Sequence, residues 1–415
     1  MKRLLATLLI MVFALVGCGA NTTSGDNVEL EFWIPGAEDE YGFYYDAAAK
    51  YSEMTEGVTI TPVQQPWGDY WTKLPLEVNN GRGPGIFITH TSYGDVLKPI
   101  SAELDTTVEE LEELGYTNTD LYVGENGKPQ FIPALYAPNV IYYNKAMWDA
   151  AGLTDADIPK TWEELESVAL KLYDEQNKVI GFDYSFHVLF DLALQDGQAV
   201  VGEDGKAQFY GDSLDTITKW QKDGVTNYMS YGAGSPEESF LQGAAAMIYG
   251  QPWMANYFTN TMPDLEFASF PMPGNADSKI KVTSQAELTP GINKNLEEAE
   301  MEAAQGFLKW MLNDEETMLS IASGNNSASA NTNYLQDQEY AEGSAGSAAV
   351  STIEDGSDMF LIIPSTLESA YNVLLESTIS TEGANKDADI EKAKISVENT
   401  DLSQTSELEK RKLSE

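Results

Sequence analysis

Aromatic, amide and acidic side chains stand close to the ends of several apolar segments of this 415-residue chain. Trp33, Trp67 and Trp253 are the aromatic examples, and Glu38 and Gln251 are polar neighbours of the first and the last. Flat indole rings stack on C–H surfaces, and amide and carboxylate oxygens accept hydrogen bonds from hydroxyl groups. If the fold brings them together, these residue types could recognise a small polar ligand that has apolar faces.

The elements that would position them begin with a strand over 29–34, where apolar and polar residues alternate. Helical spacing follows, and a β-branched strand covers 58–63. This order predicts a right-handed parallel crossover. A third strand over 86–89 follows a helix of about 69–79, which Pro75 should kink or cut short.

Capping patterns predict further helices along the chain. Thr161 and Glu164 form one capping box, and Ser235 and Glu238 form another, with Pro236 at the first helical position. Further helices are predicted at about 296–313, 365–378 and 387–397, and a strand at 244–249. Alternating strands and helices predict an α/β fold with mostly parallel sheets flanked by helices.

The composition excludes several classes of protein. The 66 acidic residues outnumber the 24 basic ones and give a net charge of −42, so we expect no nucleic-acid partner. The 21 Tyr, 15 Phe and 8 Trp exclude a disordered chain. Two His and one Cys make a zinc site or a disulfide framework implausible, although carboxylates alone could still hold a metal. The Gly-rich stretch 81–85 lacks the ending of a phosphate-binding loop, and we expect no cofactor.

The N-terminus has the pattern of a secreted protein. Lys2 and Arg3 precede the apolar run 4–15, which is too short to cross a membrane. The sequence Leu15-Val16-Gly17-Cys18 resembles a bacterial lipobox, and the alternative is a plain signal peptide with an incidental cysteine. We therefore expect a signal peptide over 1–17, lipidation of Cys18, a flexible tether over 18–27, and a body anchored to the extracytoplasmic face of the bacterial cell membrane.

Several motifs in a fixed order resemble the extracellular solute-binding proteins of ABC importers, in the carbohydrate-type group. They are Gln130-Phe131-Ile132-Pro133, Val140 to Lys145, Ala151-Gly152-Leu153, Pro159 to Leu165, Gly243 to Met247 with Gly250 and Trp253, Phe270 to Gly274, and Gly291 to Asn295. Two departures stand out. Gly85 replaces the usual Asp before a strand, and the sequence 324–327 replaces the usual Pro-Arg element.

The resemblance implies a two-lobed periplasmic-binding-protein-like fold of the class II type, with a ligand cleft between lobes joined by a hinge. Matched positions give lobe one as 28–140 plus 290–330, lobe two as 141–289 plus 331–400, and a charged tail over 401–415. The implied partners are a carbohydrate and the permease subunits of an ABC importer with a cytoplasmic ATPase. The body is expected to act as a monomer, without catalysis.

Candidate ligand contacts lie just past the predicted strand ends and in the hinge. They are Trp33, Glu38, Asp39, Trp67, His90, Thr91, Tyr136, Asn139, Tyr184, Phe186, Gln251, Trp253, Glu287 and Asn325. Each has a plainer alternative: the aromatic residues could be core, the loop acids could be solvated, and Glu287 could form a salt bridge in the hinge. Trp253 is the strongest candidate, because by resemblance it faces the ligand.

Two other functions fit the same residues. A glycoside hydrolase would need two carboxylates facing each other across one cleft, for which Glu38 and Glu287 are a possible pair. The same fold could instead bind another solute, such as a polyamine or a phosphate ester. The number of aromatic residues among the candidates favours a sugar.

Overall fold

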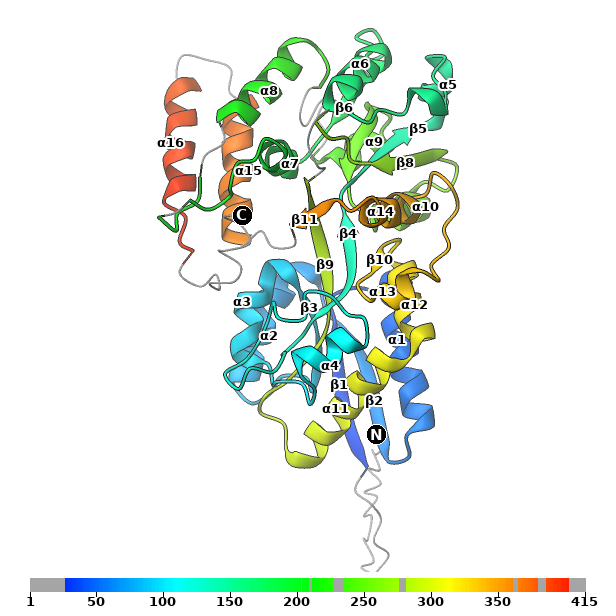
Figure 1. The fold of residues 1–415 in the computed structure, drawn as a ribbon, viewed down its shortest axis with the longest axis vertical. Helices are drawn as coiled ribbons and strands as arrows, with labels where there is room; N and C mark the ends of the chain where they lie inside the picture. The colour runs from blue at the N-terminus through cyan, green and yellow to red at the C-terminus, as the bar shows by residue number, and fades with distance from the viewer. Residues whose placement is uncertain are drawn as a thin grey trace, which may run out of the picture.

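The computed structural model describes residues 27–202, 204–208, 211–226, 234–275, 281–360, 365–379 and 386–402. The predicted signal peptide, Cys18 and the tail beyond 402 lie outside these residues. Two lobes of helices and strands lie one above the other (Figure 1). The predicted two-lobed α/β architecture is therefore present.

Lobe one is built on the predicted crossover. β1 (Val28–Ile34), α1 (Glu38–Met54), β2 (Val58–Gln64), α2 (Trp67–Asn79) and β3 (Ile86–His90) follow in order, and β1 pairs in parallel with both β2 and β3. The helix α2 runs on to its end instead of stopping at its internal proline. A proline removes only one helical hydrogen bond, and the buried face of α2 compensates for it.

The sheet of lobe one continues with three strands that alternate in direction, of which β9 (Lys281–Ile292) and β10 (Ala328–Ser329) run against the first three. β9 is antiparallel to β3 and to β4 (Pro133–Pro138), and β10 is antiparallel to β4. Besides α1 and α2, the helices of this lobe are α3 (Gly94–Leu97), α4 (Val108–Glu113), α11 (Glu298–Asn313), α12 (Glu315–Gly324) and α13 (Thr332–Leu335).

Lobe two has a smaller sheet in the order β6 (Ile180–Asp183), β7 (Ala245–Gly250), β5 (Val140–Asn144) and β8 (Phe267–Pro271). β5 is antiparallel to both of its neighbours, and only β6 and β7 are parallel within this sheet. Both sheets are therefore mixed, and the prediction of mostly parallel sheets was wrong. Alternating strands and helices do not reveal the strands that return from the other lobe.

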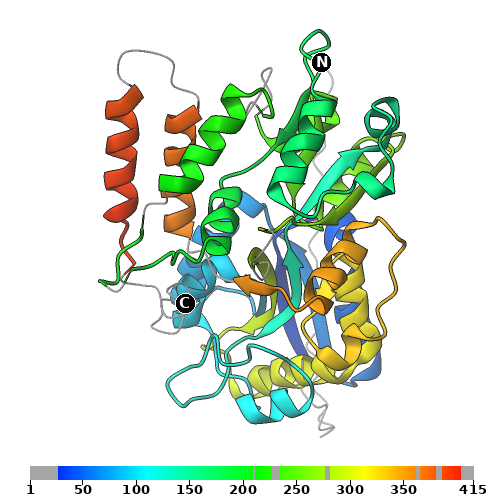
Figure 2. The same ribbon diagram turned by 45° about the horizontal axis from the view of Figure 1, so that its top comes forward.

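Helices cover the sheet of lobe two on both sides. They are α5 (Lys145–Ala150), α6 (Trp162–Leu172), α7 (His187–Gln195), α8 (Gly211–Lys222), α9 (Pro236–Leu241), α10 (Met254–Thr261), α14 (Ala345–Glu354), α15 (Ser365–Ile379) and α16 (Lys386–Glu398). The C-terminal pair α15 and α16 stands side by side at the edge of this lobe (Figure 2).

The chain crosses between the lobes at two strands that touch each other, and it crosses again between α13 and α14. Asn139 separates β4 in lobe one from β5 in lobe two. Its amide nitrogen donates to the carbonyl and to the hydroxyl oxygen of Thr283, each at 2.6 Å. In β9, Lys281–Thr283 pair with β11 (Asp358–Phe360), and Ser284 onward pairs with β4. The part of β9 after Thr283 thus belongs to the sheet of lobe one, inside a range that the sequence analysis gave to lobe two.

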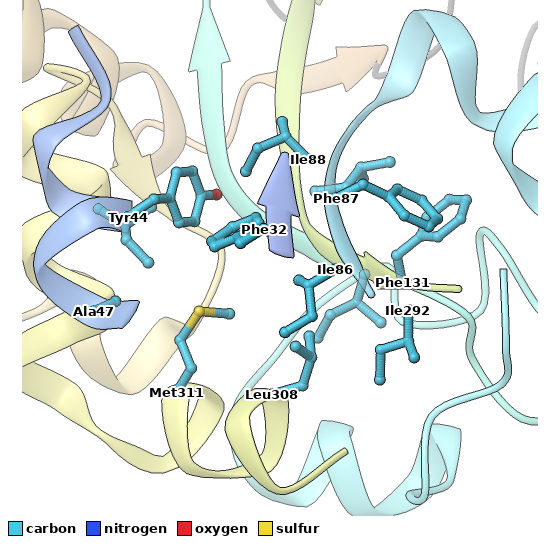
Figure 3. Packing of buried hydrophobic residues seen from close by; sticks show 14 of the residues in the cluster. Phe32, Tyr44, Ala47, Ile86, Phe87, Ile88, Phe131, Ile292, Leu308 and Met311 are labelled. Atoms are coloured by element: carbon cyan, nitrogen blue, oxygen red, sulfur yellow. The ribbon is translucent and has the colours of Figure 1, made fainter. Parts of the chain in front are cut away.

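Each lobe has its own apolar core. In lobe one, Phe32 of β1 packs edge-on against Tyr44 of α1 and Phe307 of α11, with ring centroids 5.8 and 6.1 Å apart (Figure 3). In lobe two, Trp220 of α8 packs against Trp162 of α6 and Phe182 of β6. Separate cores allow each lobe to move as a unit about the crossing strands.

The predicted caps are present, with one variation. Thr161 and Glu164 form the full capping box that starts α6. Ser235 accepts a hydrogen bond from the backbone N–H of Glu238, but the Glu238 carboxylate accepts from the backbone N–H of Gly234. In a usual capping box the Glu238 carboxylate would accept from the backbone N–H of Ser235, whereas here it accepts from the residue before it.

Gly181 in β6 provides a test of the packing in lobe two. A side-chain Cβ at this position would overlap the backbone carbonyl of Ala169 in α6. We expect Gly181→Ala to lower the free energy of unfolding by about 1–3 kcal/mol. Gly42→Ala is the control, because a Cβ there has no atom within 4 Å and should leave stability equal or slightly higher. Urea unfolding of the two variants checks this, and equal stability would contradict the tight packing.

Candidate functional site

The two lobes touch on both sides of the crossing strands. On one side, the Ser92 hydroxyl of lobe one donates to a carboxylate oxygen of Glu368 on α15, at 3.3 Å. On the other side, the Asn256 amide of α10 donates to the Gly324 carbonyl at 2.7 Å, and Asn326 donates to Asn256 Oδ1 at 2.8 Å. The helices α15 and α10, which carry Glu368 and Asn256, lie on opposite sides of the crossing strands (Figure 1).

A polar cavity lies beside the first of these contacts. Its walls come from the end of β3, the crossing strands, and the first turns of α7 and α15. The lining residues are Thr91, Ser92, Asn139, His187, Thr283, Ser284, Gln285 and Glu368. The empty space amounts to about 240 Å³, part of it open to solvent. Only about 10 Å³ of this space can hold the centre of a water-sized group, so in this arrangement of the lobes the cavity has room for about one hydroxyl group or one water molecule.

A buried hydrogen-bond network holds the crossing strands beneath the cavity. One Asp191 oxygen accepts from the backbone N–H and the hydroxyl of Thr283, at 2.6 and 2.8 Å. The other accepts from the Tyr249 hydroxyl at 2.8 Å. Burial raises the pKa of Asp191 to about 7, although the three donors each lower it. The network links α7 and β7 of lobe two to the point where β9 enters lobe one.

Glu287 belongs to a second polar cluster, on lobe one. Burial raises the pKa of its carboxyl to about 7, while the nearby Asn325 amide and Tyr44 hydroxyl lower it. Neither Glu287 Oε2 nor the Tyr44 hydroxyl makes a hydrogen bond of ordinary geometry with a described residue, and both atoms are buried. This cluster thus has unused capacity to bond a ligand hydroxyl.

The predicted aromatic residues separate into two groups. Trp253 and Trp67 keep 39% and 45% of their surface exposed, which makes both rings available to a ligand. The Trp253 indole N–H donates to Gln251 Oε1 at 2.6 Å, and Gln251 is buried, so the ring is held in one orientation. The Trp67 ring meets Trp71 and His90 edge-on.

Trp33, Tyr136 and Tyr184 lie inside the packed lobes instead. The Trp33 indole N–H donates to the Glu31 carboxylate at 3.0 Å, so the neighbouring acid satisfies a buried ring. The Tyr136 hydroxyl bonds Thr117 and Asn118, and Tyr184 packs in the core of lobe two. These three side chains are therefore part of the packing within each lobe.

The remaining candidates lie near the boundary between the lobes. His90 ends β3 and Thr91 begins the 3-10 turn that follows, and the backbone N–H of Ser92 donates to His90 Nδ1 at 3.1 Å. Phe186 is half-buried and stacks on His187, with ring centroids 4.1 Å apart. Glu38 is exposed at the start of α1, and the side chain of Asp39 lies outside the described part of the structure.

The sequence analysis missed several residues at the boundary: Ser92, His187, Asn256, Gln285 and Glu368. Ser92 and His187 adjoin residues that were selected, so a wider window would have included them. Glu368 had no local indication, because its place beside Ser92 depends on a contact across 276 residues.

The described residues contain no group of three or more His, Cys, Asp or Glu arranged to hold a metal ion. Among the same residues, no helix combines the length and the apolar character needed to cross a membrane.

The family follows from a comparison with known proteins. A model of the bacterial extracellular solute-binding protein family matches residues 46–347. The chain belongs to this family. The resemblance in the sequence motifs is thereby confirmed, and the chain is a binding protein rather than an enzyme. The glycoside hydrolase alternative therefore does not hold.

Similar proteins agree with this assignment. A maltooligosaccharide ABC transporter solute-binding lipoprotein of Streptococcus pneumoniae is 25% identical over 367 residues, which cover 82% of each chain. The cyclic α-maltosyl-1,6-maltose binding protein of Arthrobacter globiformis has a TM-score of 0.72 at 19% identity, over 90% of this chain and 98% of that one. A Listeria monocytogenes ABC substrate-binding protein in complex with cycloalternan also gives 0.72, at 18% identity and with the same coverage. The structural likenesses confirm the two-lobed fold.

The solute-binding protein should lose stability in acid because of His90. Burial lowers the pKa of this imidazole to about 4, below its ordinary value of 6.5. Between these two pH values the unfolded chain binds a proton that the folded chain does not, so stability falls as the pH falls from about 6.5 to 4.

In His90→Gln, the free energy of unfolding should fall by about 1.4 kcal/mol less per pH unit than in the unmodified protein. Thermal unfolding of both proteins from pH 7.5 to 4.5 measures it. Any packing lost in the variant shifts its curve equally at every pH, so only the slope tests the statement. Parallel curves for the two proteins would contradict it.

Proposed function

We propose that this solute-binding protein captures a sugar or oligosaccharide between its lobes and delivers it to the permease of an ABC importer. The single observation that carries the proposal is the exposed Trp253 ring, which is bonded to Gln251 and lies three residues before the interlobe contact of Asn256 at the start of α10. An indole held in one orientation offers a flat surface to the C–H face of a sugar at a small entropic cost.

The proposed mechanism is a shift of population. A ligand that touches both lobes binds the closed arrangement more tightly, and therefore increases its share. The strands joined at Asn139 and Thr283 would act as the hinge, with lobe one and lobe two moving as units. The closed protein would then dock on the permease, whose ATPase lies on the cytoplasmic side.

The names of similar proteins support a sugar as the ligand. They include the maltooligosaccharide-binding lipoprotein of Streptococcus pneumoniae and a maltodextrin-binding protein of Bacillus subtilis. The proposed contacts are the candidates that lie near the boundary. They are Trp67, His90, Thr91, Asn139, Phe186, Gln251, Trp253, Glu287 and Asn325, with Glu38 and Asp39 at the rim.

Lipid attachment at Cys18 and a place on the extracytoplasmic face of the membrane are part of the proposal. The body begins with β1 at the pole of lobe one that is farthest from lobe two (Figure 1). An anchor attached there would leave the boundary between the lobes free for ligand and permease. Radiolabelled palmitate incorporation that is lost in Cys18→Ser would test the anchor.

A thermal-shift screen tests the ligand class. The purified protein is heated with a panel of neutral glycans, spermidine and a sugar phosphate, because a ligand that binds only the folded state raises the melting temperature. We expect a concentration-dependent rise with at least one neutral glycan. A rise with spermidine or the sugar phosphate alone would overturn the proposal of a sugar.

A further inference from the structure

The cavity beside Ser92 has an unusual balance of polar groups. Its eight lining residues supply hydroxyls, amides, one imidazole and one carboxylate, and no lysine or arginine is among them. Its only acidic group is Glu368, which α15 carries to the boundary. A negatively charged ligand group in this cavity would meet a carboxylate and find no cation there.

An acceptor atom in the wall lacks a donor. Asn139 is 1% exposed, and its amide nitrogen must face Thr283, because the Thr283 carbonyl can only accept. Asn139 Oδ1 then makes no hydrogen bond of ordinary geometry with any described residue, although the Asn139 side chain also interacts with the Tyr249 hydroxyl. A buried acceptor without a partner is costly, and a ligand that brings a donor would relieve this cost.

Glu368 presents further acceptor capacity. Its one hydrogen bond across the boundary, from the Ser92 hydroxyl, is long at 3.3 Å. Burial raises the pKa of this carboxyl to about 7, and no basic side chain contributes to lowering it. The hydroxyl of a ligand could replace or share the Ser92 contact, and it would bond the carboxylate in a charge-assisted manner.

We propose that this cavity is the charge-selecting end of the binding site, where Glu368 and Asn139 Oδ1 accept hydroxyl hydrogens from a neutral sugar and Glu368 rejects acidic sugars. The inference rests on the proposed sugar-binding function and narrows it to neutral ligands. A carboxylate or phosphate on the sugar would lie against the Glu368 carboxylate, and like charges placed together across an interface exclude the wrong partner.

Calorimetric titration of the purified protein at pH 8.5, where a carboxyl with a pKa of about 7 is ionised, tests the selectivity. The probes are maltotriose and mannotriose, each paired with its derivative oxidised at C6 to a uronic acid. We expect the neutral member of at least one pair to bind at least 100-fold more tightly than its acid. In Glu368→Gln this ratio should fall at least tenfold, because the amide carries no charge but keeps the same shape.

Two control variants make the result specific. Glu376→Gln makes the same charge change at an exposed position on α15, and Ser92→Ala removes the partner hydroxyl without changing the charge. Glu376→Gln should keep the ratio of the unmodified protein, and Ser92→Ala, which alters the cavity wall itself, should retain a preference for the neutral sugar. If Glu368→Gln still binds the neutral sugar and leaves the ratio of neutral to acidic affinity unchanged, the charge selection is wrong but the proposed function stands. Failure of every glycan to bind the unmodified protein would overturn the proposed function as well.

Discussion

Trp253→Ala should weaken sugar binding at least tenfold, a loss of about 1.4 kcal/mol. The ring is 39% exposed at the start of α10, three residues before the interlobe contact of Asn256, and its N–H donates to Gln251 Oε1 at 2.6 Å. Removing it deletes a stacking surface that needs no reorganisation before the ligand arrives. Stability should change little, because the space left by an exposed ring opens to water, which can bond Gln251.

Titration calorimetry with the glycan found in the thermal-shift screen measures this loss, and the melting temperature of each protein is recorded alongside. Leu170→Ala is the control, since Leu170 is a 45% exposed apolar residue on α6 of the same lobe, where no candidate contact lies. Equal affinity in Trp253→Ala and the unmodified protein would remove Trp253 from the site.

Asp191→Ala should lower the free energy of unfolding by about 3 kcal/mol or more. The variant leaves two donors of Thr283 and the hydroxyl of Tyr249 without their acceptor, in a region closed to solvent. Sugar affinity should also fall, because Thr283 is the residue that Asn139 holds where the chain crosses between the lobes.

Asp191→Asn is the matched control for this prediction. Its remaining side-chain oxygen can still accept from Thr283, and its amide can donate to the Tyr249 hydroxyl. We therefore expect it to retain most of the stability that the alanine variant loses. Urea unfolding of the three proteins compares them, and a loss below about 1 kcal/mol in Asp191→Ala would contradict a structural role for the network.

The local structure could be predicted well from the sequence. Residue alternation predicted β1, β-branched residues predicted β2, and Thr161 with Glu164 predicted the start of α6, because short-range patterns and caps determine these elements. The motifs that are typical of the family also predicted two lobes. The direction of β9 could not be found in this way, since its pairing with β3 and β4 joins residues far apart in the sequence.

The candidate site shows the same limit. Trp33 was selected because acidic neighbours are unusual for a buried indole, yet Glu31 accepts the hydrogen bond that allows the ring to be buried. Trp67 and Trp253 were selected because they follow predicted strands, Trp253 also by resemblance to the family, and both are exposed. The alternation of residues along a strand does not distinguish a buried tryptophan from an exposed one, because burial depends on whether the indole N–H finds a hydrogen-bond partner. Glu368 reaches Ser92 only through the complete fold.

The central claim is that the lobes close on a sugar that leaves chemically unchanged. The most direct test measures the distance between spin labels on the two lobes, at the exposed positions Glu302 of α11 and Lys222 of α8, each replaced by cysteine in a Cys18→Ser background. We predict that the bound glycan shifts the distances towards one shorter population and is recovered intact by chromatography. Distances that do not respond to saturating glycan, or cleavage products in the recovered ligand, would contradict the account.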